Sequence, residues 1–112
     1  IALDRIPEAI DNLRKLDKAG HDRAEVLHML GWCLEAKKEY TQAVKALEEA
    51  IKINPKQLKT HAILVEVLHD RLSQPEDARK VLDDMIAANA QSHQAYLTRA
   101  RYLQRRGDEK GA

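Results

Sequence analysis

The feature that most constrains this chain is an internal repeat with a period of 34 or 35 residues. Four sets of equivalent positions recur with this period. They are Ala9, Ala43, Ala78 and Ala112; Leu13, Leu47 and Leu82; Leu34, Leu68 and Leu103; and Gly31, Val65 and Ala100. In arrays of this kind each repeat is one supersecondary unit that buries its apolar side against its neighbours. We place the one extra residue of the longer period in the turn at 73–75, because a loop absorbs an insertion without disturbing packed helices.

Each period contains two stretches with the spacing of an amphipathic helix. Leu27, Leu30 and Leu34 fall on one helical face, since they stand at i, i+3 and i+7. Gly31 and Ala43 are small enough to let the two helices of a pair approach closely. The predicted helices cover residues 6–18, 22–37, 41–53, 57–72, 75–88 and 92–106. Because their connections are short, neighbours should be antiparallel, and the predicted fold class is all-α.

Local start signals support these boundaries. Pro75 lies where the first turn of a helix tolerates proline. Asp22 with Glu25 has the spacing of a capping box, and Ser73 with Glu76 has the same spacing. We therefore expect side-chain caps at the starts of the second and fifth helices.

Composition and charge exclude several classes of protein. Of the 112 residues, 44% are apolar and 33% are charged, and the formal net charge is +1, so no global field would attract nucleic acid or an anionic membrane. No apolar stretch approaches the ~20 residues of a membrane span. The single cysteine, Cys33, cannot form an internal disulfide; it is expected to act as a small core residue, and a reducing compartment such as the cytoplasm is favoured for this soluble chain.

The stretch from residue 24 to residue 57, AEVLHMLGWCLEAKKEYTQAVKALEEAIKINPKQ, resembles the tetratricopeptide repeat. The places that this family gives to W, L, G, Y, Y, A, F, A and P are held here by Leu27, Leu30, Gly31, Leu34, Tyr40, Ala43, Leu47, Ala50 and Pro55. The resemblance implies a right-handed superhelix (α-solenoid) of about six helices, forming one domain over residues 1–112. Within it we expect a half repeat (1–21), two full repeats (24–57 and 58–92) and a second half repeat (93–112).

The second full repeat departs from the family pattern. His61 stands in the tryptophan place, Val65 in the glycine place, Met85 in the later alanine place and Ala90 in the proline place, so we expect this repeat to pack less well. Arg99 replaces the leucine of the earlier repeats, which would suit a solvated cap. The match of residues 107–112 to the start of a further second helix instead favours a fragment of a longer array, as does the absence of a leading Met.

The resemblance also implies where function lies. In this family the first helices of successive pairs line a concave groove that holds peptides of partner proteins, so we expect a non-catalytic protein–protein interaction scaffold. By position, the groove would be lined by Glu25, His28, Trp32, Glu35, Lys59, Ala62, Glu66, His69, Gln94, Leu97, Arg101 and Arg105. Trp32 would serve as an apolar anchor or would pack against the preceding helix. Arg101 and Arg105 would grip a carboxylate or phosphate, or would simply be solvated.

One known subgroup of the family binds the C-terminal carboxylate of chaperone tails through Lys, Asn and Arg side chains. Those places hold His28, Trp32, Ile63, Gln94 and Thr98 here. The carboxylate clamp is therefore absent, and we expect no binding of chaperone tails by that mechanism.

Residues that could carry chemistry are scattered. No two of the five histidines stand three or four residues apart on one predicted helix, as a metal pair would. No glycine-rich loop and no nucleophile motif is present, so we expect no cofactor, no metal and no catalysis. Two alternatives to the groove stay open: a structural or self-associating segment, which could form a homodimer, and contact with RNA through the basic residues between 99 and 112, which has less support because few aromatic residues accompany them.

Overall fold

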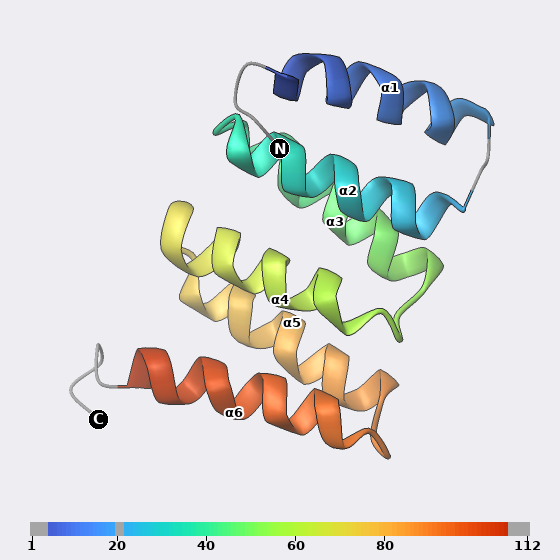
Figure 1. The fold of residues 1–112 in the computed structure, drawn as a ribbon. Coiled ribbons are helices and arrows are strands. Elements are labelled where there is room, and N and C mark those ends of the chain that lie inside the picture. Colours follow the sequence, from blue (N-terminus) through green and yellow to red (C-terminus); the bar gives the residue numbers. More distant parts are fainter. Residues whose placement is uncertain (1–4, 20–21, 108–112) are drawn as a thin grey trace.

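The computed structural model describes residues 5–19 and 22–107, and throughout this part of the chain the regular elements are helices (Figure 1). They are α1 (Ile6–Ala19), α2 (Arg23–Ala36), α3 (Tyr40–Ile53), α4 (Leu58–Glu66), a π-helical turn η2 (Val67–Arg71) that continues α4, α5 (Pro75–Ala88) and α6 (His93–Gly107). The predicted all-α fold of six helices is confirmed. None of the helices is long and apolar enough to cross a membrane, as far as the described residues go.

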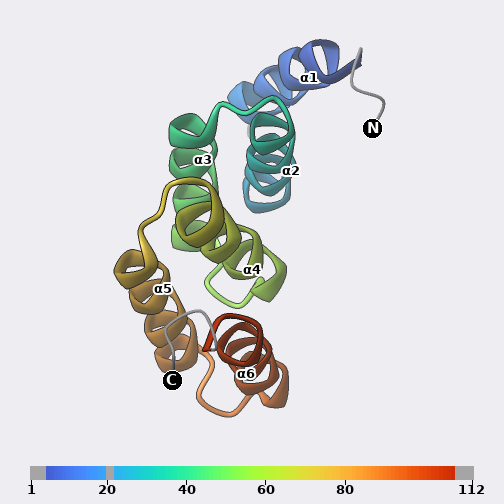
Figure 2. The same cartoon turned by 90° about the vertical axis from the view of Figure 1, so that its left-hand side faces the viewer.

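The helices form two layers. Seen along the helix axes, α3 and α5 lie on one side of the molecule, and α2, α4 and α6 lie on the other (Figure 2). Each helix of the first layer packs against the helix that precedes it, so that α2 pairs with α3 and α4 pairs with α5. The connections between partners span only three residues (37–39 and 72–74), which forces each pair to be antiparallel.

The α2–α3 pair is close because α2 has no side chain at its crossing point. A Cβ atom on Gly31 would lie 2.5 Å from Cγ of Leu47 and 3.4 Å from the carbonyl oxygen of Ala43. In the second pair Val65 stands in the place of Gly31 and is buried, and α4 and α5 pack less extensively. This difference agrees with the expectation that the second repeat packs less well.

The extra residue of the longer period lies inside a helix. The connections at 37–39 and 72–74 have the same length. The two helices before them differ: α2 is α-helical throughout, whereas its equivalent, α4–η2, ends in a π-helical turn. In η2 the N–H of Leu72 bonds the carbonyl of Val67 at 3.0 Å, five residues back. A π-turn holds more residues than an α-turn, so it absorbs the insertion between Leu68 and Ala78. Our placement of this residue in the turn at 73–75 was wrong.

The predicted side-chain caps are also absent. Asp22 precedes α2 with a φ of 33°, and its side chain makes no capping hydrogen bond. Ser73 has a φ of 54°, and α5 is preceded by Gln74, which does not cap it either. A cap residue normally has an extended backbone, which directs its side chain at the first free N–H groups; these left-handed residues turn the chain instead.

Two apolar clusters fill the space between the layers. The first joins α1, α2 and α3, and the second joins α3, α4, η2, α5 and α6. Cys33 lies in the first cluster with 1% of its surface exposed, and burial raises the pKa of its thiol, which agrees with its expected role as a small core residue. Between the turn after α3 and the end of α5, the side-chain N–H groups of Asn89 donate to the carbonyl oxygens of Pro55 (3.0 Å) and Met85 (2.9 Å).

Candidate functional site

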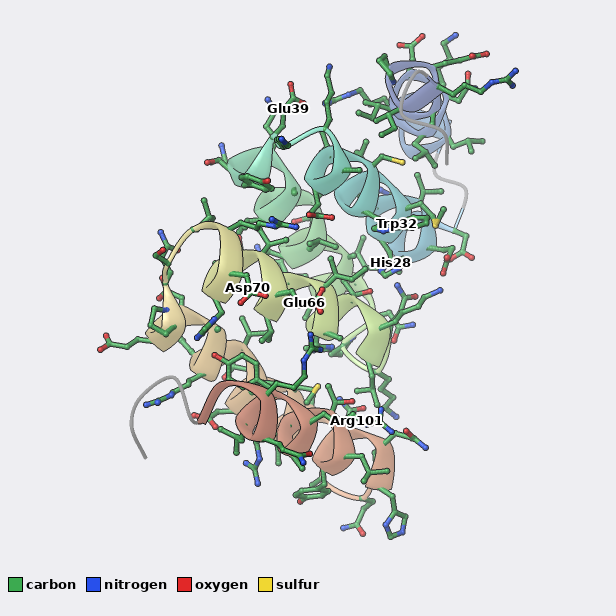
Figure 3. The ribbon with its side chains drawn as sticks, turned by 60° about the vertical axis from the view of Figure 1, so that its left-hand side comes forward. His28, Trp32, Glu39, Glu66, Asp70 and Arg101 are labelled. Atoms are coloured by element: carbon green, nitrogen blue, oxygen red, sulfur yellow. The ribbon has the colours of Figure 1, made fainter. Side chains whose placement is uncertain are left out.

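The surface formed by α2, α4, η2 and α6, which we call the inner face, carries two hollows of about 230 Å³ each (Figure 3). The first, here the Trp32 pocket, lies between α2 and α4–η2 and is lined by Trp32, Glu35, Ile63, Glu66, Val67, Asp70 and Arg71. The second, here the Arg101 pocket, lies between α4 and α6 and is lined by Ala62, Val65, Glu66, Leu82, Thr98, Arg101, Tyr102 and Arg105. Glu66 belongs to both and forms the ridge between them.

Trp32 is an exposed aromatic residue in the middle of a helix that is otherwise largely buried. Its exposed fraction is 43%, whereas the next two residues, Cys33 and Leu34, are almost fully buried. Because neighbouring residues on a helix point about 100° apart, the core face of α2 turns the indole toward the inner face. Ile63 and Val67 contribute apolar atoms to the pocket beside it, but charged side chains make most of its lining polar.

Among the side chains that the structure describes, three ion pairs connect neighbouring helices across the inner face. The ammonium of Lys59 lies 2.9 Å from a carboxylate oxygen of Glu25, joining α4 to α2. The other two pairs are Arg71 with Glu35 at 3.4 Å and Arg105 with Glu66 at 3.7 Å. Exposed pairs of this kind contribute only ~0.2–1 kcal/mol each, but they fix the rotamers of charged side chains around the two pockets.

Arg101 differs from these residues. Its side chain is exposed at the mouth of its pocket, and no carboxylate or hydrogen-bond acceptor among the described residues pairs with its guanidinium. It is therefore a cation whose full hydrogen-bonding capacity is open to a partner.

A comparison with known protein families gives a match that includes α2, the helix that carries Trp32. A model of the tetratricopeptide repeat matches residues 24–57, which comprise α2 and α3. Residues 24–57 are a tetratricopeptide repeat. Searches of curated proteins and of solved structures found no match.

Tetratricopeptide repeats typically mediate protein–protein interactions and are generally non-catalytic. The first helix of this repeat, α2, contributes Trp32 and Glu35 to the inner face. No group of three or more His, Cys, Asp or Glu side chains in the described segments is placed to hold a metal ion.

Some of the predicted groove residues line the two pockets, and others do not. Trp32, Glu35 and Glu66 meet at the first pocket, and Glu66, Arg101 and Arg105 meet at the second, where Ala62 also lies. Glu25 and Lys59 pair with each other near the start of their helices. Gln94 and Leu97 are exposed on α6 but line neither pocket.

His28 lies between the helices and does not open onto the inner face. It is only 6% exposed, and its Nδ1 lies 2.9 Å from the hydroxyl of Thr60, which also accepts a hydrogen bond from Gln57. Burial and the positive charge of Lys59 lower the pKa of His28, and Glu25 partly opposes this. The expectation that His28 contacts a partner is therefore replaced by a role in joining the tetratricopeptide repeat to α4.

His69 is also engaged within the chain. Its ring packs edge-on against Tyr102 with centroids 5.5 Å apart, and its Nδ1 lies 2.9 Å from a carboxylate oxygen of Asp70. In its place, Asp70 and Arg71 reach the Trp32 pocket. The π-turn changes the helical register after Val67, so counting by a constant period from Glu35 missed these two residues.

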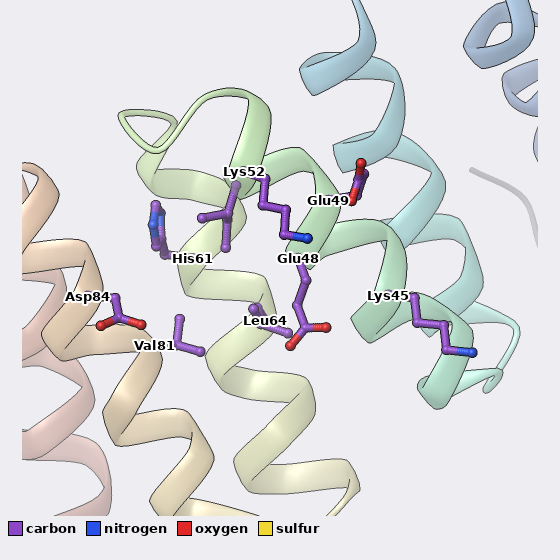
Figure 4. A pocket seen from close by; sticks show the side chains of 9 residues that line it. Lys45, Glu48, Glu49, Lys52, His61, Leu64, Val81 and Asp84 are labelled. Carbon is purple, nitrogen blue, oxygen red and sulfur yellow. The ribbon is translucent and has the colours of Figure 1, made fainter.

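A larger hollow of about 480 Å³ lies on the other layer, between α3 and α5 with α4 beneath (Figure 4). It is lined by Lys45, Glu48, Glu49, Ile51, Lys52, His61, Leu64, Val81 and Asp84. It exists because α3 and α5 both pack on α4 and hardly on each other. The sequence pattern did not predict this hollow.

Proposed function

We propose that this chain is a non-catalytic scaffold that binds a partner peptide or domain along its inner face. The binding residues would come from the set predicted above, with Trp32, Glu35, Glu66, Arg101 and Arg105 nearest to the two pockets. In this proposal residues 58–92 form a second repeat beside the tetratricopeptide repeat, and residues 1–21 and 93–112 belong to neighbouring half repeats.

The observation that supports this function most is the exposure of Trp32 beside a pocket whose lining is largely polar. An indole supplies a large rigid contact area and one hydrogen-bond donor, and tryptophan is enriched among residues whose truncation weakens protein interfaces most. If Trp32 served only to stabilise the fold, we would expect its exposed fraction to be lower than 43%.

The packing of the inner helices favours the same function. The pair between Glu25 and Lys59 and the bond between His28 and Thr60 both hold α2 against α4. A surface that is already ordered loses less conformational entropy when it binds a partner. The inner face would therefore bind a partner segment with little rearrangement of its own helices.

The experiment is a selection of peptides from a random displayed library on the intact chain, followed by affinity measurements with variants. We expect Trp32→Ala to weaken the selected peptides by about tenfold or more, which is the effect of removing an interface anchor of ~1.4 kcal/mol or more. Ile53→Ala is the matched control, because Ile53 is equally exposed (43%) and lines neither inner-face pocket. Equal affinity for both variants would argue against binding at the inner face.

A second candidate function is self-association through α6. Tyr96, Leu97 and Leu103 are 43%, 45% and 48% exposed. Tyr96 and Leu103 stand in the repeat places of His61 and Leu68, which a following helix buries. Exposed apolar patches of this kind favour association. Sedimentation equilibrium tests it: a mass that rises with concentration and falls to that of a monomer in Leu103→Glu would support this function, whereas a constant monomer mass would exclude it.

A further inference from the structure

The hollow of about 480 Å³ between α3 and α5, here the outer hollow, lies in the layer opposite the inner face (Figures 2 and 4). Its floor and one of its walls come from α4 and α5. These helices contribute two aliphatic side chains, Leu64 and Val81, and two polar ones, His61 and Asp84. A hollow of this size can hold a side chain of a partner, and the polar groups that line it decide which side chain fits.

His61 carries a hydrogen-bond acceptor that the chain itself does not use. The side chain is 1% exposed, and its Nδ1 lies 3.3 Å from the carbonyl oxygen of Gln57. A carbonyl oxygen can only accept, so this bond requires the proton on Nδ1 and leaves Nε2 of the neutral ring as an acceptor. Burial lowers the pKa of His61, and the bond to Gln57 and the charge of Asp84 oppose this only in part, so the ring is neutral at neutral pH.

Nε2 of His61 opens onto the outer hollow. It has no hydrogen-bond partner among the described residues. In that same part of the chain, no fully buried side-chain nitrogen or oxygen lacks a partner. Nε2 is therefore accessible, and the opening that reaches it is the hollow that His61 lines.

Asp84 supplies a second acceptor on the same wall. Its carboxylate is exposed and forms no ion pair or hydrogen bond with any residue that the structure describes. The two lysines of the lining, Lys45 and Lys52, both come from α3, and their side chains extend away from α5 (Figure 4). The wall made by α4 and α5 thus offers a negative charge and a neutral acceptor, with no cation beside them in the lining.

The charges of the α3 wall do not reverse this balance. Glu48 and Glu49 stand there with the two lysines, so the complete lining has three carboxylates and two ammonium groups. None of these five groups forms an ion pair within the described segments. A cationic ligand therefore suits the outer hollow better than an anionic one.

Arginine fits these acceptors better than other cations. No group of three or more His, Cys, Asp or Glu side chains in the described ranges is placed to hold a metal ion, so the ligand must reach His61 and Asp84 with separate donors. A guanidinium has several N–H donors in one plane, whereas the ammonium of lysine is a compact and strongly hydrated point charge. The aliphatic stem of arginine can pack on Leu64 and Val81 while its head stays at the polar groups.

We infer that the outer hollow binds an arginine side chain of a partner protein, whose guanidinium donates hydrogen bonds to Nε2 of His61 and to the carboxylate of Asp84. The site lies on the opposite side of α4 from the inner face. The chain would thus have two separate binding surfaces, and the second does not depend on the proposed function of the first.

The experiment is an NMR titration of the intact, isotope-labelled chain with a blocked pentapeptide that has a central arginine between leucines. The imidazole signals of His61 report on the outer hollow, and the indole N–H of Trp32, the only tryptophan, reports on the inner face. Matched peptides carry lysine or citrulline, which has the shape of arginine without its charge. We expect the arginine peptide to bind about tenfold more tightly than the citrulline peptide, because hydrogen bonds between charged groups are the stronger ones.

The position of the peptide is read from His61 and from one pair of variants. The Nε2 resonance of His61 should move toward that of a protonated nitrogen as it accepts the bond. Asp84→Asn should remove most of the preference for arginine over citrulline. Asp83→Asn is the matched control and should leave the preference unchanged, because Asp83 is an exposed neighbour on α5 that does not line the hollow.

Three results would overturn the inference. They are an unchanged His61 spectrum, equal affinity for the arginine and citrulline peptides, and an equal loss of preference in Asp83→Asn and Asp84→Asn. Shifts confined to the indole of Trp32 would place the arginine on the inner face and would also overturn it. The proposed function stands or falls separately, on the response of library-selected peptides to Trp32→Ala.

Discussion

Leu47 packs directly against the bare backbone of Gly31, at a distance that leaves no room for a side chain. A Cβ atom on Gly31 would lie 2.5 Å from Cγ of Leu47 and 2.6 Å from its Cδ2, and Leu47 is fully buried. The close approach of the two helices in the tetratricopeptide repeat thus depends on a residue without a side chain.

Gly31→Ala should therefore lower the free energy of unfolding. Alanine favours a helix over glycine by ~1 kcal/mol, but overpacking a rigid site costs ~1–3 kcal/mol, so we expect a net loss of up to ~2 kcal/mol in urea unfolding. In a Leu47→Ala background the same change should be neutral or stabilising, because the obstructing side chain is gone. A similar loss in both backgrounds would show that contact with Leu47 is not the cause.

Asn89 should contribute more than an ordinary polar residue near a helix end. Asn89→Ala removes donors to two carbonyl oxygens, those of Pro55 and Met85, and a buried acceptor left without a partner costs ~1–3 kcal/mol. We expect a loss of that size in thermal unfolding. Asn54→Ala, on an exposed residue whose side chain accepts a single hydrogen bond, is the control and should cost less.

Acid should destabilise the chain through two buried histidines. Burial is the largest cause that lowers the pKa of both His28 and His61 from 6.5. Below that pH the unfolded chain binds more protons than the folded chain, so the free energy of unfolding falls as the pH decreases. The stabilising contribution is complete above about pH 6.5, the ordinary imidazole pKa, and is lost as the pH falls toward the lowered pKa.

The measurement compares urea unfolding at about pH 7.5 and about pH 5, on either side of that value. His61→Leu should reduce the loss of stability between the two conditions. His93→Gln, at the exposed start of α6, should not. An equal pH dependence in His61→Leu and the intact chain would contradict the assignment to His61.

The π-turn should be removable. Deleting Asp70 restores the shorter period and leaves Leu68 and Ala78 in register with the core, so we expect a loss of about 1 kcal/mol or less, as for a surface change. Deleting Asp83 from the middle of α5 rotates Met85 out of the core and should cost more than about 3 kcal/mol. If both deletions destabilise the fold equally, η2 does not accommodate the insertion.

The helices were predictable because their signal is periodic. Leu27, Leu30 and Leu34 define a core face that the structure buries, and small residues mark where the paired helices cross. The π-turn was not predictable in this way, since a single extra residue in a loop and one in a helix give the same spacing between the repeated residues. Its position depends on packing energies, which the spacing does not reveal.

The candidate site was predictable in part. Glu25 and Lys59 stand one period apart, and equivalent places of successive inner helices prove to be neighbours. By contrast, whether a side chain is open to a partner depends on contacts between distant residues, such as the bond of His28 to Thr60. Arg101, which has no partner among the described residues, could be distinguished from the paired Arg105 only once side-chain positions were known.

The most direct test of the central claim uses Trp32 itself, which is the only tryptophan in the chain. A selected non-fluorescent peptide is titrated into the intact chain while the tryptophan emission and its quenching by acrylamide are recorded. Binding at the inner face predicts a shift of the emission to shorter wavelength and a loss of quenching, with the same midpoint as the binding curve. An unchanged emission and unchanged quenching at saturating peptide would contradict the account.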